Sequence, residues 1–179
     1  MLEDIHSVLL TEEQIKARVE ELGEAISRDF AGKDPFFIGV LKGCFVFMAD
    51  LMRRVDTHCE MDFMAVSSYG NKSVTTGAVK INYDLNTDIE GRHVIVVEDI
   101  LDSGLTLSYL ENYLKGRNPA SFSICTLLDK PTRRRADVSA NYVGFEIPDA
   151  FVVGYGLDYA ERYRNLPFIG ILKPEIYTD

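Results

Sequence analysis

The sequence predicts an α/β fold, with one doubly wound and mostly parallel β-sheet between helices. Short apolar runs rich in β-branched residues alternate with longer segments in which apolar residues recur at helical spacing. The chain has 179 residues, 46% hydrophobic and 26% charged, and it shows no repeat or linker, so we expect one domain over 1–179. In such sheets ligands bind beyond the carboxyl ends of the strands, so the residues that follow each apolar run are the first candidates for a functional site.

The N-terminal half alternates between a helix, a strand and a second helix. Thr11 and Gln14 fit a capping box at the start of an amphipathic helix over 12–30, which Asp34 and Pro35 end. A buried strand is expected at 36–41 and a helix at 44–55. Further strands are expected at 60–68, 78–83, 93–97, 121–128, 141–145, 151–153 and 168–172, with a helix at about 105–115.

Charge and cysteine content narrow the class of protein. The net charge of −9 argues against a general nucleic-acid binder, because binding to phosphates needs clustered Lys and Arg. The three cysteines form no CxxC pair, which is typical of reduced thiols in a cytoplasmic protein. We expect no signal peptide, and the apolar runs are too short to span a bilayer. The run Arg133-Arg134-Arg135 follows Pro131 and is expected to be a solvated turn.

Two carboxylates directly follow the apolar run 94–97. Glu98 and Asp99 would be costly at the end of a buried strand unless a divalent cation or ligand hydroxyls offset their charge. Asp102 comes three residues after Asp99, in front of a predicted helix, where it can act as a general base. An acidic helix cap would explain Asp102 alone.

The residues after Asp102 suit a phosphate. Gly104 lets a ligand approach the backbone closely, and Ser103 and Thr106 bring hydroxyl groups to a helix N-terminus, where free N–H groups and the helix dipole favour an anion. A simple helix cap does not explain the combination of two acids, two spacers and Asp-Ser-Gly-x-Thr. The segment 98–106 is therefore the candidate functional site.

This segment resembles the phosphoribosyl-diphosphate signature of the type I phosphoribosyltransferases. The resemblance implies a fold with a small hood from both chain ends, with Glu98 and Asp99 binding the ribose hydroxyls and Mg²⁺. It also implies that Asp102 accepts a proton from the imidazole nitrogen of a purine. Some relatives carry Lys where this chain has Leu105, so the site of this chain lacks one positive charge that those relatives have. The 5-phosphate would be held by Asp102, Ser103, Gly104, Leu105 and Thr106.

Two lysines at strand ends resemble binding residues of the hypoxanthine-guanine branch of this family. Lys42 and Gly43 resemble its pyrophosphate loop, although taken alone they are better explained as a solvated Lys and a turn Gly. Lys130 resembles the lysine that hydrogen-bonds the 6-oxo group of the purine. A 6-amino group would offer this cation no acceptor, which favours 6-oxopurines as substrates.

The segment 143–159 resembles the purine-binding region of the same branch. Phe151 would stack on the base, Val152 would offer backbone groups to the base edge, and Asp158 would lie near base and metal. These residues could equally be the core of a buried strand pair. Arg164 resembles an arginine that contacts pyrophosphate, although alone it would be taken for a surface charge.

Ser68, Tyr69 and the polar stretch to Gly77 resemble the mobile lid of this family, expected over about 68–78. A lid fits the chemistry, because an activated ribosyl centre must be protected from water. A plain loop between strands remains the alternative. The resemblance also implies a homodimer or a homotetramer.

Together these segments predict an Mg²⁺-dependent enzyme of purine salvage. It would transfer phosphoribose from 5-phosphoribosyl 1-diphosphate to hypoxanthine or guanine and release pyrophosphate. One alternative is a non-catalytic sensor of the diphosphate, which would need a basic nucleic-acid face. Another is a receiver-like signalling domain, which would not require the Asp-Ser-Gly-x-Thr segment.

Overall fold

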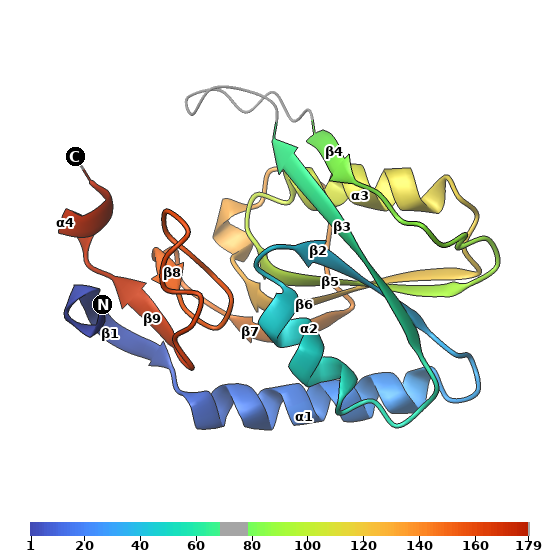
Figure 1. Cartoon of the computed structure of the whole chain (residues 1–179), viewed down its shortest axis with the longest axis horizontal. Coiled ribbons are helices and arrows are strands. Elements are labelled where there is room, and N and C mark those ends of the chain that lie inside the picture. Colours follow the sequence, from blue (N-terminus) through green and yellow to red (C-terminus); the bar gives the residue numbers. More distant parts are fainter. Residues whose placement is uncertain (69–78, 179) are drawn as a thin grey trace.

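A six-stranded sheet forms the body of the computed structural model, which describes residues 1–68 and 79–178 (Figure 1). The strand order is β4-β3-β2-β5-β6-β7, and all neighbours are parallel except the antiparallel pair β3 and β4. The strands are β2 (Phe36–Leu41), β3 (Glu60–Ser68), β4 (Val79–Tyr83), β5 (His93–Leu101), β6 (Ser121–Asp129) and β7 (Tyr142–Glu146).

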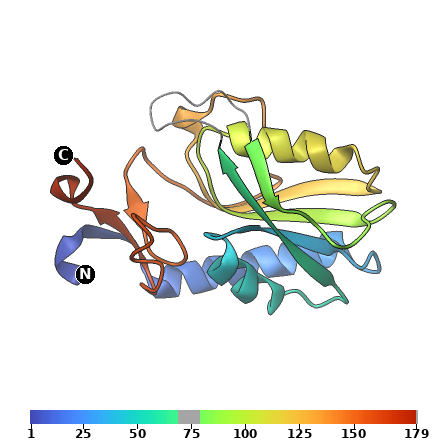
Figure 2. The same cartoon turned by 45° about the horizontal axis from the view of Figure 1, so that its top comes forward.

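Helices cover both faces of this sheet, as the sequence predicts. On one face α1 (Glu12–Asp29) and α2 (Phe45–Met52) pack with Ile95 and Val97 of β5 in one core cluster. On the other face α3 (Leu105–Lys115) packs with Val94 and Val96 in a second cluster (Figure 2). Because successive side chains of a strand point to opposite faces, the continuous apolar run 94–97 supplies both cores.

The expected capping box fixes the start of α1. The Thr11 N–H donates to Oε1 of Gln14 at 2.8 Å, and the Gln14 N–H donates to Oγ1 of Thr11 at 3.2 Å. Farther along the helix, Arg18 donates to the carbonyls of Gly144 and Val143 at 2.8 and 2.7 Å, which joins α1 to β7. These bonds fix α1 against the face of the sheet that carries the first core cluster.

A three-stranded antiparallel sheet, here called the hood, lies at one side of the body, with the two chain ends next to each other (Figures 1 and 2). It consists of β1 (Ile5–Leu10), β9 (Ile169–Leu172) and β8 (Val152–Val153), in that order. Strand β1 was not predicted, because the residues of this strand do not alternate between buried and exposed. The remaining short helices are η1 (Leu2–Asp4), η2 (Pro131–Arg133) and α4 (Pro174–Tyr177).

One boundary differs from the prediction in a way that matters for function. β5 continues to Leu101, where the apolar pattern had placed its end at Val97. Pairing with β6 extends it, since Glu98 lies opposite Thr126 and Leu101 opposite Asp129. The acidic pair therefore belongs to a hydrogen-bonded strand of fixed backbone. Among the helices of the described residues, we find none long and apolar enough to cross a membrane.

Candidate active site

A cavity of about 450 Å³ opens beyond the carboxyl ends of β5 and β6. Its lining comes from four places in the chain: the end of β5 with the loop after it, the segment after β6, the segment that enters and leaves β8, and Tyr177 of α4. It is of the size that small-molecule sites have in proteins. Six of the predicted site residues line it: Asp99, Asp102, Lys130, Phe151, Val152 and Asp158.

The predicted phosphate loop caps α3. Gly104 is the N-cap residue with a φ of +79°, a left-handed conformation that favours glycine, and a Cβ there would lie 2.6 Å from Val138. The first N–H groups of a helix have no partner inside the helix, and Ser103 Oγ accepts only a long contact of 3.4 Å from Leu105 N–H. A hollow of about 100 Å³ lies here, lined by Glu98, Ser103, Gly104 and Thr106 among others.

Glu98 and Asp99 point into different spaces, as neighbours on a strand do. Glu98 lines the small hollow of the phosphate loop, and Asp99 lines the large cavity. Burial raises the pKa of Glu98 well above its ordinary value, and the neighbouring Asp99 raises it further. Burial also raises the pKa of Asp99 to about 6, although the Ile100 N–H, 2.8 Å from its Oδ1, works in the opposite direction. Both carboxyl groups are therefore poised to gain from a cation or from hydroxyl donors.

These carboxylates do not enclose a metal on their own. Within residues 1–68 and 79–178, no three His, Cys, Asp or Glu side chains come close enough to form a metal cage. The predicted set of Glu98, Asp99 and Asp158 is therefore not a preformed cluster. Mg²⁺ commonly binds through one or two carboxylates together with substrate phosphates and water, and Asp99 and Asp158 lining one cavity suit that mode.

Asp102 places one unsatisfied oxygen in the site. Its Oδ1 is buried and receives no hydrogen bond from any described residue. Nε of Arg133 lies 2.9 Å from this oxygen, but the N–H direction is poor, so the contact is an ion pair and not a hydrogen bond. The Asp102 side chain is still 42% exposed, so its carboxylate as a whole stays open to a ligand while Arg133 covers Oδ1.

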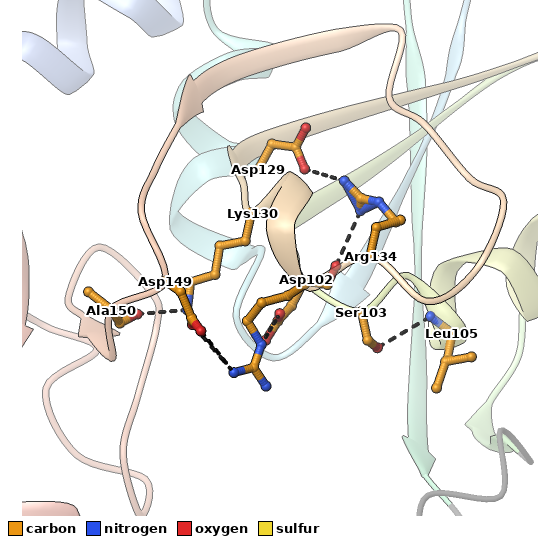
Figure 3. Close-up of polar contacts among 9 residues, drawn as sticks. Asp102, Ser103, Leu105, Asp129, Lys130, Arg134, Asp149 and Ala150 are labelled. Carbon is orange, nitrogen blue, oxygen red and sulfur yellow. Dashed lines mark hydrogen bonds and ion pairs between the residues drawn. The ribbon is translucent and has the colours of Figure 1, made fainter.

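Lys130 is buried, with 7% of its surface exposed, whereas a single lysine at a strand end is usually solvated. Its Nζ donates to the carbonyl of Ala150 at 2.7 Å and lies 3.9 Å from Oδ1 of Asp149 (Figure 3). Burial lowers its pKa, while Asp102 and Asp149 act in the opposite direction. An ammonium group has three N–H donors, so Lys130 can still donate to a ligand.

Phe151 presents an aromatic ring at the cavity, with 36% of its surface exposed. The ring of Tyr177 stacks on it with centroids 4.6 Å apart and an interplanar angle of 20°, and Tyr159 meets it edge-on at 5.6 Å. The next residue, Val152, is buried in β8. Tyr177 was not predicted as a site residue, because a single aromatic residue near the chain end belongs to no motif.

The loop after β2 meets the loop after β8. Nζ of Lys42 lies 3.2 Å from Oε2 of Glu161, and a Cβ at Gly156 would lie 2.2 Å from the carbonyl oxygen of Gly43. Nη2 of Arg164 lies 2.9 Å from Oδ1 of Asp158, and its Nη1 donates to the Gly156 carbonyl at 2.7 Å. Arg164 is thus a largely buried, anchored cation, whereas its pattern alone suggested a surface charge.

The run Arg133-Arg134-Arg135 was expected to be a solvated turn, and this expectation is wrong for Arg134. Arg134 is largely buried and pairs with Asp129, and it also donates to the Asp102 carbonyl at 3.3 Å (Figure 3). Arg133 reaches Asp102 as described above. In contrast, Arg135 has an exposed side chain. The backbone of Ser68 ends β3 opposite Val79, while Tyr69 and the rest of the predicted lid lie outside the described residues.

Most of the residues that line the cavity lie in a segment that matches a known protein family. The family model "Phosphoribosyl transferase domain" matches residues 7–160, and the chain belongs to that family of transferases.

Individual relatives place the chain among the hypoxanthine-guanine phosphoribosyltransferases. The hypoxanthine-guanine phosphoribosyltransferase of Bacillus subtilis is 58% identical over 99% of this chain and 98% of its own length. The bifunctional protein TilS/HprT of Listeria monocytogenes is 56% identical, and this chain spans 28% of that longer protein. A crystal structure of a hypoxanthine phosphoribosyltransferase from Staphylococcus aureus superimposes with a TM-score of 0.97, at 52% identity over 100% of this chain and 97% of that one. The predicted fold is thereby confirmed.

Proposed function

We propose that the cavity and the phosphate loop together transfer phosphoribose from 5-phosphoribosyl 1-diphosphate to hypoxanthine or guanine. The bond from ribose C1 to the diphosphate oxygen breaks, a bond from C1 to a purine imidazole nitrogen forms, and pyrophosphate leaves. The observation that carries this proposal is that the Asp102 carboxylate, whose side chain is 42% exposed, lines the same cavity as the buried ammonium of Lys130. An acceptor and a donor side by side match the imidazole N–H and the 6-oxo group of a 6-oxopurine.

The base is held by groups that the cavity brings together. Lys130 donates to the 6-oxo oxygen with an N–H that Ala150 does not use. Phe151 stacks on the ring, and the backbone of Val152 meets the base edge. Asp102 accepts the imidazole proton as the glycosidic bond forms, which raises the nucleophilicity of the attacking nitrogen. Adenine would place an amino group against the Lys130 cation, with no acceptor for it.

The phosphoribosyl group is held by the acidic strand end and the helix cap. The loop from Asp102 to Thr106 binds the 5-phosphate through the N–H groups at the start of α3. Glu98 and Asp99 accept hydrogen bonds from the ribose hydroxyls, and Lys42, Gly43 and Arg164 meet the diphosphate. Orientation and electrostatic stabilisation supply most of the rate increase in this scheme.

A divalent cation fits the same place. Mg²⁺, when bound, would neutralise charge on the leaving diphosphate, with Asp99 and Asp158 as its protein ligands. Glu98 lines the small hollow and not the large cavity, so it would lie away from this ion. Asp99 is buried and its pKa is raised, so a cation at this place would offset the cost of its charge, which supports this assignment. The lid over 68–78, with Ser68 and Tyr69, stays part of the proposal as the segment that would exclude water.

We further propose a cytoplasmic protein that acts as one domain and assembles as a homodimer or homotetramer. Cys44 and Cys125 are buried and Cys59 is partly buried, all as free thiols, which supports a reducing compartment. Sedimentation equilibrium would measure the assembly state.

A turnover assay with 5-phosphoribosyl 1-diphosphate, Mg²⁺ and separate purine bases tests the proposal. We expect nucleotide from hypoxanthine and guanine, and none from adenine. Binding of the diphosphate without turnover of hypoxanthine, guanine or xanthine would favour a diphosphate sensor of the same fold.

A further inference from the structure

Arg133 stands between two carboxylates on opposite walls of the cavity. Its Nε lies 2.9 Å from Oδ1 of Asp102, which belongs to the loop after β5. Its Nη1 lies 3.3 and 3.4 Å from the two carboxylate oxygens of Asp149, two residues before Phe151. All three side chains line the cavity. One guanidinium group therefore joins the wall that carries the proposed general base to the wall that carries the stacking ring.

The backbone around Arg133 is fixed independently of its side chain. The turn η2 closes with an N–H of Arg133 that donates to the Lys130 carbonyl at 3.1 Å. After it, the N–H groups of Arg135 and Ala136 donate to the Ser103 carbonyl at 2.8 and 3.3 Å. Arg134 adds its pair with Asp129 and its bond to the Asp102 carbonyl (Figure 3). Changing the Arg133 side chain should leave this segment attached to the phosphate loop.

We propose that Arg133 is a positioning residue of the transferase reaction, which holds the Asp102 carboxylate at the imidazole edge of the purine by bracing it against Asp149. The inference rests on the proposed function, because it concerns the orientation of the group that receives the purine proton. A guanidinium presents several N–H donors in a rigid plane, so it can bind one carboxylate through Nε and another through Nη1. This is how the two anions keep a fixed separation across the cavity.

The contact geometry leaves Asp102 ready to accept a proton. Arg133 holds Oδ1 through an ion pair of 2.9 Å, while the Asp102 side chain as a whole is 42% exposed, so the carboxylate is held on one side and open on the other. Asp102 and Asp149 raise the pKa of Arg133, in agreement with a guanidinium held between two negative charges. A positioned but unsatisfied carboxylate is the state that a general base needs before the purine arrives.

A plain surface ion pair would behave differently. The side chains of Arg133, Asp102 and Asp149 are 47%, 42% and 54% exposed, and exposed pairs contribute little to stability. A structural role would therefore change neither kcat nor the melting temperature by much. A positioning role changes kcat, because a small displacement of a reacting group can cost up to about a hundredfold in rate.

The experiment compares wild type with Arg133→Gln, Arg133→Lys and a matched control, Arg135→Gln. Turnover is measured with 5-phosphoribosyl 1-diphosphate, Mg²⁺ and hypoxanthine. Arg135→Gln removes the same charge from the same run, at a side chain that is exposed. We expect Arg133→Gln to lower kcat by roughly ten- to a hundredfold with less than a threefold change in KM for the diphosphate. Arg133→Lys should recover part of the loss, since it restores the charge without the fork. Arg135→Gln should match wild type.

A double-mutant cycle completes the test. Asp149→Asn alone should lower kcat less than Arg133→Gln does. The double variant should have a kcat no lower than that of Arg133→Gln, because both substitutions break the same contact between Arg133 and Asp149. Thermal melting of each variant shows whether it is folded. A kcat of Arg133→Gln within twofold of wild type, or an equal loss in Arg135→Gln, overturns the inference while leaving the proposed function intact. Absence of turnover in the wild-type protein would instead overturn the proposed function itself.

Discussion

The carboxylate of Asp99 occupies the space that any side chain at position 43 would need. A Cβ built on Gly43 would lie 1.7 Å from Oδ2 of Asp99 and 2.5 Å from its Cγ. The loop after β2 thus approaches the acidic end of β5 at a distance that only glycine permits. This contact joins two segments that the sequence analysis assigned separately, to pyrophosphate and to ribose with metal.

Gly43→Ala should therefore damage binding of the diphosphate substrate. The added methyl group must displace either the loop or the Asp99 carboxylate, and both belong to the proposed site for that substrate. We expect the KM for 5-phosphoribosyl 1-diphosphate to rise by roughly tenfold or more, because misplaced positioning groups are costly. Steady-state kinetics at saturating hypoxanthine would measure it.

Gly116→Ala is the matched control. Gly116 ends α3 with an ordinary φ of −61°, and a Cβ there would make contacts of 3.4 and 3.5 Å. Its kinetics should equal those of wild type. A Gly43→Ala protein with unchanged KM would show that the loop and Asp99 do not act together.

Lys130→Met should weaken the preference for 6-oxopurines. The change removes the buried cation and its bond to the Ala150 carbonyl while keeping most of the side-chain volume. We expect kcat/KM for hypoxanthine to fall by about a hundredfold or more, since a site built to hydrogen-bond a substrate group discriminates strongly. Adenine meets no cation in the variant, so its turnover should be no lower than in the wild type. Parallel assays with both bases measure the ratio, and Lys16→Met, on the exposed side of α1, serves as control.

The stability of the ligand-free, metal-free protein should fall as the pH rises toward neutrality, in part because of Asp99. Its pKa lies at about 6 in the folded protein against an ordinary value of 3.8, so the folded state binds this proton more tightly than the unfolded chain does. That contribution is fully present below about pH 4 and is lost as the pH passes through 6. Its size is on the order of 3 kcal/mol.

Urea unfolding of wild type and Asp99→Asn between pH 4 and 7.5 measures this effect together with the part of the Glu98 pKa shift that Asp99 causes. Carboxyl groups with lowered pKa, such as Asp84, act with the opposite sign but are the same in both proteins. The variant should gain stability relative to wild type as the pH rises. Two curves that stay parallel over this range would show that Asp99 does not titrate abnormally.

The sequence predicts those parts of the site that lie on one continuous segment. Glu98 to Thr106 combine a buried strand, two acids and a helix cap, and each of these patterns is local. Arg133 and Asp149 were missed because their importance comes from meeting Asp102 across the cavity, which depends on how the turn after β6 folds back. β1 was missed because a strand of the hood has little core to face, so its burial pattern does not alternate. Tertiary contacts between distant segments leave no periodicity in either partner.

Tyr177 should support purine binding through Phe151. The two rings stack at 4.6 Å, and both line the cavity, so Tyr177 fixes the plane of the ring on which the base is proposed to lie. Stacked aromatic pairs are worth roughly 0.5–1.5 kcal/mol beyond the area they bury. Tyr177→Ala should therefore raise the KM for hypoxanthine by about two- to tenfold and leave the KM for the diphosphate unchanged. Tyr177→Phe keeps the ring and should behave as wild type. If Tyr177→Phe were as impaired as Tyr177→Ala, the hydroxyl group and not the stacked ring would be the feature that matters.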